Sequence, residues 1–367
     1  MTRPSTSSFR SPRLRAIAGG LFVAISTACA GEGIGPSEAT NSADSPTTAS
    51  GDSTQIDSTR IDSTQVDSTA LAPTDSTALP PTDTTGISDA SAALDTRSRL
   101  PGIVFASDNI PVEYFNSVHN GSKYGGAISP SNVLEVLAAA RAKGGRLFLK
   151  LHMGRDSYVQ DSNGTFSLTK WKSLIDRFKG INLAPYIADG TIVAHFLIDE
   201  PHRAAKWGGK IIPQATVEAM AQYSKQIWPT LTTVTHTQTP WLASSSITYR
   251  YLDASWSQYA AAKGEIAKWT ASEIASAKSK RLGIVLGLNV LDGGNGSSKI
   301  PGWSRRQWAM SANEMRTYGA AVLNQSYACA FFMWAHDTNY YGRTDIELAM
   351  AELSAKAKAH AKTSCQQ

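Results

Sequence analysis

The sequence predicts a TIM-type (β/α)8 barrel, preceded by an N-terminal region of very different composition. From residue 102 onward, short apolar runs alternate with helix-length segments, as in a parallel sheet whose strands are buried on both faces. This part has about 270 residues and contains all nine Trp, and a single barrel needs about 250 residues. No Gly-rich phosphate-binding loop follows the first apolar run, which argues against an open nucleotide-binding sheet.

Residues 1–29 predict an export signal, because four Arg and no acid precede the apolar stretch 16–25. That stretch is too short to span a bilayer, and no later segment of the sequence is long and apolar enough. It ends in Ser26-Thr27-Ala28-Cys29, which resembles the lipobox of bacterial lipoproteins, although that family prefers Leu at the position of Ser26. The resemblance implies an exported chain, lipidated on Cys29 and anchored to the cell envelope at the outer membrane or cell surface. Ordinary signal-peptidase cleavage is the alternative.

Residues 30–97 predict a disordered linker. They repeat a five-residue unit, as in DSTQI, DSTRI, DSTQV and DSTAL, and carry a net charge of −9. One weakly apolar residue per unit cannot offset the entropy lost on ordering, and like charges extend the chain. We expect this linker to hold the folded domain, residues 98–363, away from the lipid surface.

The folded domain shows seven apolar runs of strand length. An eighth strand is expected within residues 112–128, unless the barrel has only seven. Ser129 before Pro130, and Ser311 with Glu314, are expected to cap helix N-termini. The predicted strands are Ile103–Ala106, Arg146–Leu151, Ile192–Ile198, Thr232–Thr235, Ala254–Trp256, Ile284–Leu288 and Ala330–Trp334. The predicted helices are Ser131–Lys143, Leu168–Phe178, Gln214–Trp228, Ala260–Lys280, Ser311–Leu323 and Asp345–His360.

The charge of the folded domain bears on its partners. The whole chain is +5, the first 29 residues are +4 and the linker is −9, so residues 98–367 carry +10. A basic domain favours acidic ligands or anionic surfaces. The same charge would also result if the Lys and Arg residues simply lie on the solvent-exposed sides of the outer helices. No basic run is interleaved with aromatic residues, so nucleic acid is not an expected partner, and we expect a monomer.

Polar and aromatic residues follow almost every predicted strand. Barrel enzymes carry their sites on these loops, so the sequence predicts a ligand-binding cleft at this face. The candidate binding residues are Asp108, His152, Asp199, His202, Gln238, Trp256, Gln258, Asn289 and Trp334.

The run His195-Phe196-Leu197-Ile198-Asp199-Glu200-Pro201 ends an apolar strand on two acids and a proline. It resembles the strand that delivers the acid/base glutamate of clan A glycoside hydrolases, where Asn-Glu-Pro is usual. Leu149-Lys150-Leu151-His152 and Phe332-Met333-Trp334 extend the likeness, whose layout covers most of residues 100–345. The resemblance implies hydrolysis of a polysaccharide or oligosaccharide, with Glu200 as the general acid and no cofactor.

Two positions depart from that family. Asp199 replaces the usual Asn, and the penultimate strand, which ends in Asn289-Val290-Leu291-Asp292, lacks the second Glu that serves as nucleophile. Asp292 and Asp337 are the available substitutes, with Asp108 a third. A second carboxylate farther from Glu200 suits an inverting mechanism, because a water molecule must fit between the two carboxylates and the sugar. A non-catalytic glycan-binding barrel that has lost its nucleophile is the alternative function.

The acids and histidines near the strand ends also suit roles outside sugar chemistry. Asp199 and Glu200 could form structural salt bridges with Arg155 or Arg203. The five His near strands could bind zinc, but no HExxH spacing exists, and core packing suits His195 better. A Ser/His/Asp triad lacks its Gly-x-Ser-x-Gly turn, so neither a metal nor a triad is expected.

Cys329 and Cys365 are expected to form a disulfide. Cys329 starts the final strand and lies at the N-terminal face of the barrel, and the closing helix Asp345–His360 returns the chain to that face. Export supplies an oxidising compartment, and lipidation of Cys29 leaves an even pair.

Overall fold

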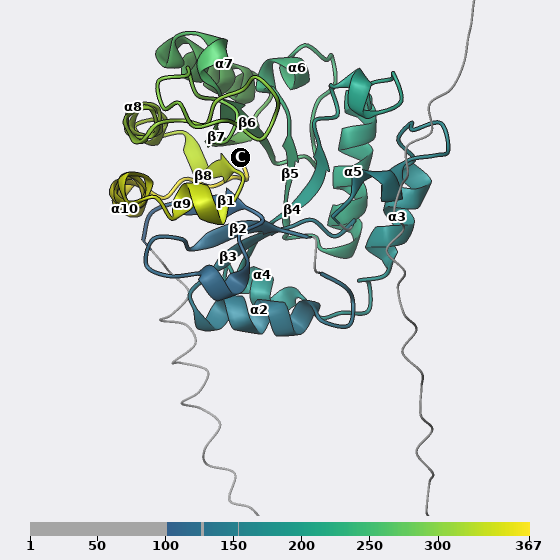
Figure 1. The fold of residues 1–367 in the computed structure, drawn as a ribbon. Coiled ribbons are helices and arrows are strands. Elements are labelled where there is room, and N and C mark those ends of the chain that lie inside the picture. Colours follow the sequence, from purple (N-terminus) through teal and green to yellow (C-terminus); the bar gives the residue numbers. More distant parts are fainter. Residues whose placement is uncertain (1–100, 126–127, 153) are drawn as a thin grey trace, which may run out of the picture. The chain divides into compact units, whose positions relative to one another are not determined.

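The computed structural model describes residues 101–125, 128–152 and 154–367, and the predicted signal, Cys29 and the linker lie outside this part. Eight parallel strands form a closed barrel in which each strand pairs with the next and β8 pairs with β1 (Figure 1). The prediction of a TIM-type barrel is therefore confirmed. The strands are β1 (Val104–Asp108), β2 (Gly121–Tyr124), β3 (Arg146–Leu149), β4 (Ile192–Asp199), β5 (Thr232–His236), β6 (Ala254–Tyr259), β7 (Gly283–Asn289) and β8 (Ala328–Trp334).

The helices surround the strands (Figure 1). Five of the six predicted helices agree with the structure to within a few residues, whereas residues 260–280 contain a 3-10 turn, Ala261–Lys263, before the helix begins at Ile266. Gly264, with φ +82°, separates the two. The helices are α2 (Val133–Ala142), α3 (Leu168–Asp176), α4 (Ala184–Ala188), α5 (Gln214–Ile227), α6 (Thr239–Ala243), α7 (Ile266–Ser279), α8 (Ala312–Leu323), α9 (Thr338–Tyr341) and α10 (Thr344–Ala359). None of these helices combines the length and apolar character that crossing a membrane requires.

One of the two predicted helix caps is confirmed. The Ser311 hydroxyl accepts from the backbone N–H of Glu314, whose carboxylate accepts from the backbone N–H of Ser311, so the two form a capping box on α8. The prediction for Ser129 is wrong, because α2 begins at Val133 with Asn132 at its N-cap. The Asn132 side chain accepts from the backbone N–H of Ser129 at 2.7 Å, which closes a turn ahead of the helix.

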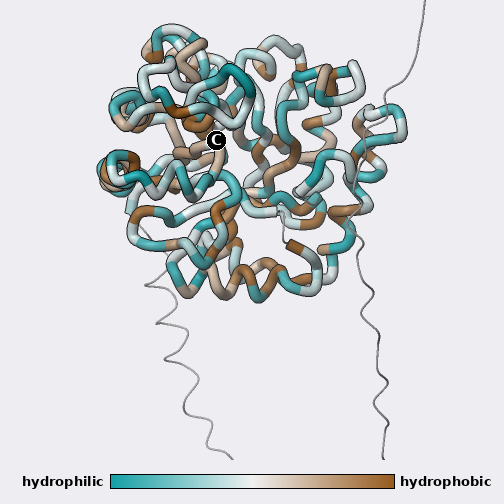
Figure 2. Tube along the Cα trace, viewed as in Figure 1, coloured by the Kyte–Doolittle hydropathy of each residue, from teal (hydrophilic) through white to brown (hydrophobic). Residues whose placement is uncertain are grey.

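The core has two parts. One cluster fills the inside of the barrel, where Phe148, Phe196, Trp256 and Phe332 pack in edge-to-face and tilted contacts. A larger cluster lies between the barrel and its helices. Figure 2 shows hydrophobic segments along the strands and hydrophilic segments along the outer loops. Successive side chains of a regular strand alternate between these clusters, as Leu147, Phe148 and Leu149 do on β3.

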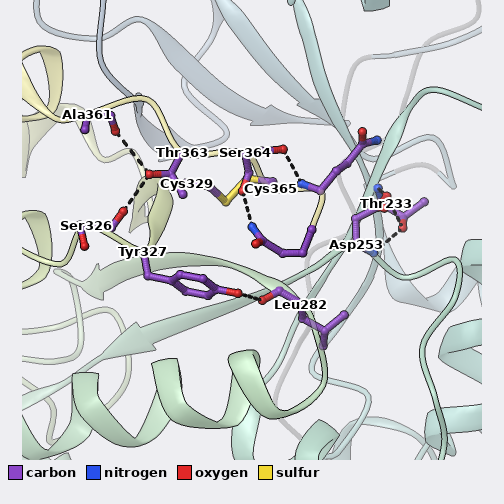
Figure 3. Close-up of a disulfide and its surroundings, with 12 residues drawn as sticks. Thr233, Asp253, Leu282, Ser326, Tyr327, Cys329, Ala361, Thr363, Ser364 and Cys365 are labelled. Atoms are coloured by element: carbon purple, nitrogen blue, oxygen red, sulfur yellow. Dashed lines mark hydrogen bonds between the residues drawn. A yellow bond between two sulfur atoms is a disulfide. The ribbon is translucent and has the colours of Figure 1, made fainter.

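The barrel floor, the face where the strands begin, is covered by the C-terminal tail. A disulfide joins Cys329 on β8 to Cys365, the pair that the chain topology predicts, with Cα atoms 5.2 Å apart (Figure 3). A Cβ on Gly283, at the start of β7, would lie 2.5 Å from the backbone oxygen of Cys365, so only glycine fits under the tail. The tail is held further by Thr363, which donates to the carbonyl of Ser326.

Candidate active site

The barrel mouth, the face where the strands end, is lined by polar residues because of the strand alternation. Phe148, Val234 and Trp256 face the inner core. Residues two positions further along a strand share the same face. On or directly after each strand, the residue at the mouth end of this inner face is polar or aromatic, and on β4 it is Asp199. These residues are Asp108, Lys123, Lys150, Asp199, His236, Gln258, Asn289 and Trp334.

Asp199 reaches the mouth through a register shift in β4. Phe196 pairs with Val234 of β5, but the next paired residue is Asp199, opposite His236. Leu197 and Ile198 both pack in the outer cluster, although they are consecutive in the strand. The extra residue therefore turns Asp199, rather than Ile198, toward the inside of the barrel.

Asp199 and His236 form a hydrogen-bonded dyad. Asp199 Oδ1 lies 2.6 Å from His236 Nδ1, and Asp199 Oδ2 accepts from the ammonium of Lys206. Burial would raise the pKa of Asp199, but His236, Lys206 and Lys123 outweigh burial and hold it well below the usual range. An ionised Asp199 keeps a proton on Nδ1, so neutral His236 has Nε2 as its acceptor.

Glu200 is held in a left-handed backbone conformation, with φ +49°. Its N–H donates to the carbonyl of His236 at 2.8 Å, and its carbonyl accepts from the backbone N–H of Arg203 and the indole N–H of Trp207. Such conformations are uncommon and costly for a residue with a side chain, so the surrounding structure must hold them in place. The neighbouring backbone thus fixes the direction in which the Glu200 carboxylate leaves the strand.

The two oxygens of the Glu200 carboxylate differ in their contacts. Oε2 accepts from Arg203 at 2.7 Å and lies 3.8 Å from the ammonium of Lys206. Oε1 receives no hydrogen bond from the residues that the structure describes. Oε1 is therefore the oxygen available to a ligand.

Glu200 lines a cavity of about 430 Å³ at the mouth, a volume typical of small-molecule sites. His202 is oriented there by a 2.8 Å hydrogen bond between Nδ1 and the Thr237 hydroxyl. Burial lowers the pKa of His202. The remaining lining residues are Arg203, His236, Gln238, Ser257, Gln258, Ala260, Lys263 and Asn289.

An ion-pair network borders this cavity. Lys206 bridges Asp199 and Asp156, with 3.0 Å between its ammonium and Asp156 Oδ2, and Lys150 lies 3.2 Å from the same carboxylate. Lys123 pairs with Asp108 at 2.8 Å, and both side chains are buried. Burial lowers the pKa of Lys123, but Asp108 and Asp199 outweigh it and raise the pKa, so the ammonium stays charged.

The predicted binding residues divide into two groups. His202, Gln238, Gln258 and Asn289 line the cavity together with Glu200. The other predicted residues lie around it. Asp108 is paired with Lys123, His152 is fully buried, Trp256 packs against His236 with ring centroids 4.6 Å apart, and Trp334 contacts Trp303.

Asp292 and Asp337, the carboxylates predicted to act together with Glu200, form hydrogen bonds within the loops that follow β7 and β8. Asp292 accepts from the backbone N–H and the hydroxyl of Ser304 at 2.9 and 2.6 Å. Asp337 caps α9 through the backbone N–H of Tyr340 and accepts from the Trp303 indole. Among the described residues, Glu200 is the one carboxylate that lines the cavity.

Some of the predicted acids and histidines have structural roles, in a salt bridge or in the core. The predicted salt bridge from Glu200 to Arg203 is present, at 2.7 Å. His195 packs in the core, as expected, where its Nδ1 lies 2.8 Å from the Ser224 hydroxyl. Within the described part of the chain, no group of three His, Cys, Asp or Glu is placed to hold a metal ion.

No protein-family model and no curated protein sequence matches the chain. Solved structures with a similar fold include a GH18 chitinase from Pseudoalteromonas aurantia, at a TM-score of 0.43 and 12% identity, covering 68% of this chain and 99% of the chitinase chain. A putative α-L-fucosidase from Bacteroides thetaiotaomicron has a TM-score of 0.44 and 10% identity, over 72% and 95% of the two chains. A β-galactosidase from Rahnella sp. R3 has a TM-score of 0.46 and 10% identity, over 73% and 57%.

Proposed function

We propose that this chain is an exported, lipid-anchored enzyme that hydrolyses glycosidic bonds, with Glu200 as the general acid. The placement of Glu200 carries the proposal, because a carboxylate on a constrained backbone lines the cavity at the barrel mouth. One of its oxygens is free of hydrogen bonds from the described residues. A carboxylic acid so placed protonates the leaving oxygen of a sugar, a contribution of about 10²–10⁴-fold in rate.

His236 supplies the base in this proposal, in place of a second carboxylate. Its Nε2 accepts a proton from water while Asp199 holds Nδ1–H at 2.6 Å. Water attacks the anomeric carbon, its proton passes to Nε2, and the glycosidic oxygen leaves with the proton of Glu200. Direct attack by water inverts the anomeric configuration.

A glycan-binding barrel without catalysis is the second candidate. It is favoured by the positions of Asp292 and Asp337, which hold loops and leave Glu200 as the one carboxylate lining the cavity in the described part of the chain. In that case His202, Gln238 and Asn289 would bind sugar hydroxyls without bond cleavage.

The two candidates are separated by screening the mature protein against a panel of polysaccharides, measuring both binding and release of reducing ends. The variants are Glu200→Gln and, as a control, Glu135→Gln on the exposed side of α2. Hydrolysis predicts release by the wild type and by Glu135→Gln, and loss of release by Glu200→Gln with binding and melting temperature retained. Binding without release by the wild type selects the second candidate, and undiminished release by Glu200→Gln refutes the role of Glu200. Mass spectrometry of the N-terminal peptide tests lipidation of Cys29.

A further inference from the structure

Among the cations that line the cavity in the described part of the chain, Lys263 is the one without an ion pair. One carboxylate, Glu200, and two cations, Arg203 and Lys263, line the cavity, and an ion-pair network borders it. Lys123, Lys150, Lys206 and Arg203 each have an ion pair, and no carboxylate of the described residues lies within 4.0 Å of the Lys263 ammonium. Because Arg203 is paired with Glu200, the Asp, Glu, Lys and Arg residues that line the cavity carry one positive charge in excess, at Lys263.

The Lys263 ammonium is held in position by groups that carry no charge. It donates to the backbone carbonyl of Gln258 and lies 5.4 Å from the centroid of the Trp269 ring. An ammonium has three donors, and only one of these is used by the described residues. Two donors thus remain for a ligand, on a group whose place is already fixed.

Arg203 and Lys263 have different roles in this cavity. The Arg203 guanidinium is bound to Glu200 Oε2. Burial lowers the pKa of Lys263, while Glu273 and then Glu200 oppose this without contacting its ammonium, and Glu200 and Lys263 line the same cavity. A ligand can therefore reach Oε1 of Glu200 with one part and the Lys263 ammonium with another.

We propose that Lys263 binds an anionic group on the sugar, so that the substrate is an acidic glycan. The class of substrate as a glycan rests on the function proposed above. The anion is the carboxylate of a uronic acid or a sulfate ester, either of which accepts a charge-assisted hydrogen bond from an ammonium. The net charge of +10 on residues 98–367 attracts such polymers over a longer range.

Binding of monosaccharides tests this proposal without any cleavage, because they contain no glycosidic bond. Galacturonate and glucuronate are each compared with their neutral methyl esters, and galactose 6-sulfate with galactose, by NMR titration at low ionic strength. The variants are Lys263→Gln and the matched control Lys268→Gln, which removes the same charge from α7 at a side chain that is 79% exposed.

We expect the wild type to bind at least one anionic sugar about tenfold more tightly than its neutral counterpart, the effect of one charge-assisted hydrogen bond. Lys263→Gln should abolish this preference and Lys268→Gln should keep it. The pair that shows the preference identifies carboxylate or sulfate. The proposal is overturned if no anionic sugar is preferred, or if the two variants behave alike. Anion preference without cleavage of any polysaccharide would instead refute only the hydrolase.

Discussion

Nδ1 of His236 lies 2.6 Å from Oδ1 of Asp199, across the pair of strands β4 and β5. This contact exists because the register of β4 shifts by one residue between Phe196 and Asp199. The same shift places Glu200, the next residue, at the edge of the cavity. Two adjacent acids therefore have different surroundings. Asp199 is surrounded by three cationic or imidazole groups, whereas Glu200 keeps one oxygen free of hydrogen bonds from the described residues.

His236→Gln is expected to lower kcat by about 10²–10⁴-fold with little change in KM, because it removes a base and leaves the cavity shape largely intact. Asp292→Asn should keep most of the activity, since the Asp292 carboxylate binds Ser304. Steady-state kinetics on the substrate found in the polysaccharide screen measure both effects. The reverse result, an active His236→Gln and an inactive Asp292→Asn, would show that Asp292 rather than His236 acts together with Glu200 in catalysis.

His195 is expected to make folding stability depend on pH. Burial lowers the pKa of His195 to about 3, below the ordinary value of about 6.5. Below pH 6.5 the unfolded chain therefore binds a proton that the folded chain excludes, and stability falls by about 1.4 kcal/mol per pH unit until the pH approaches 3. Urea unfolding at pH 7.5, 6 and 5 measures this slope.

His195→Gln should flatten this dependence by about one proton, even if it lowers the stability at every pH. Other buried histidines add to the wild-type slope, since burial also lowers the pKa of His119 to about 4. The comparison variant is His360→Gln, at the end of α10, where the side chain is partly exposed. Equal slopes for the wild type and His195→Gln would show that His195 is protonated in the folded barrel.

Removal of the disulfide in a Cys329→Ser/Cys365→Ser double variant is expected to destabilise the barrel by about 3–4 kcal/mol, because the bridge closes a 36-residue loop. The loss should appear in denaturant unfolding of the oxidised protein. The wild type treated with a reductant should unfold at the same denaturant concentration as the double variant. A double variant as stable as the oxidised wild type would mean that the disulfide adds nothing to the stability of the barrel.

Deletion of residues 30–97 should leave the melting temperature of the barrel unchanged. Their composition offers no apolar surface with which to dock on the domain. Calorimetry of the exported protein with and without this segment provides the comparison, and a shift of several degrees would show that the segment contacts the barrel.

The fold can be predicted from the sequence because seven runs of strand length alternate with segments of helix length. β2 shows why the eighth is hard to place: Gly121-Ser122-Lys123-Tyr124 has almost no apolar character. This strand is held by its pairing with β1 and β3, and Lys123 is compensated by Asp108. Both are long-range contacts, which periodicity along the chain does not reveal.

The candidate site can be predicted only in part, for the same kind of reason. Glu200, His202, Gln238, Gln258 and Asn289 follow the strands predicted from the sequence, and that position is sufficient to select them. The dyad requires the register shift in β4, which the largely apolar sequence of that strand does not reveal. Lys263 lies in a stretch whose composition is helical, and Gly264 is the one local sign that the helix begins later.

Both ends of the described chain leave the barrel from its floor. Residue 103 precedes β1 and donates to the carbonyl of Ala357, while Cys365 is bonded to Cys329 at the start of β8. A fluorescent protein, an affinity tag or a solid support joined directly at residue 101 or at Gln367 would consequently be attached on the side opposite the cavity. The described part of the chain can thus be immobilised or displayed through either of its ends, with the barrel mouth accessible to large insoluble polymers.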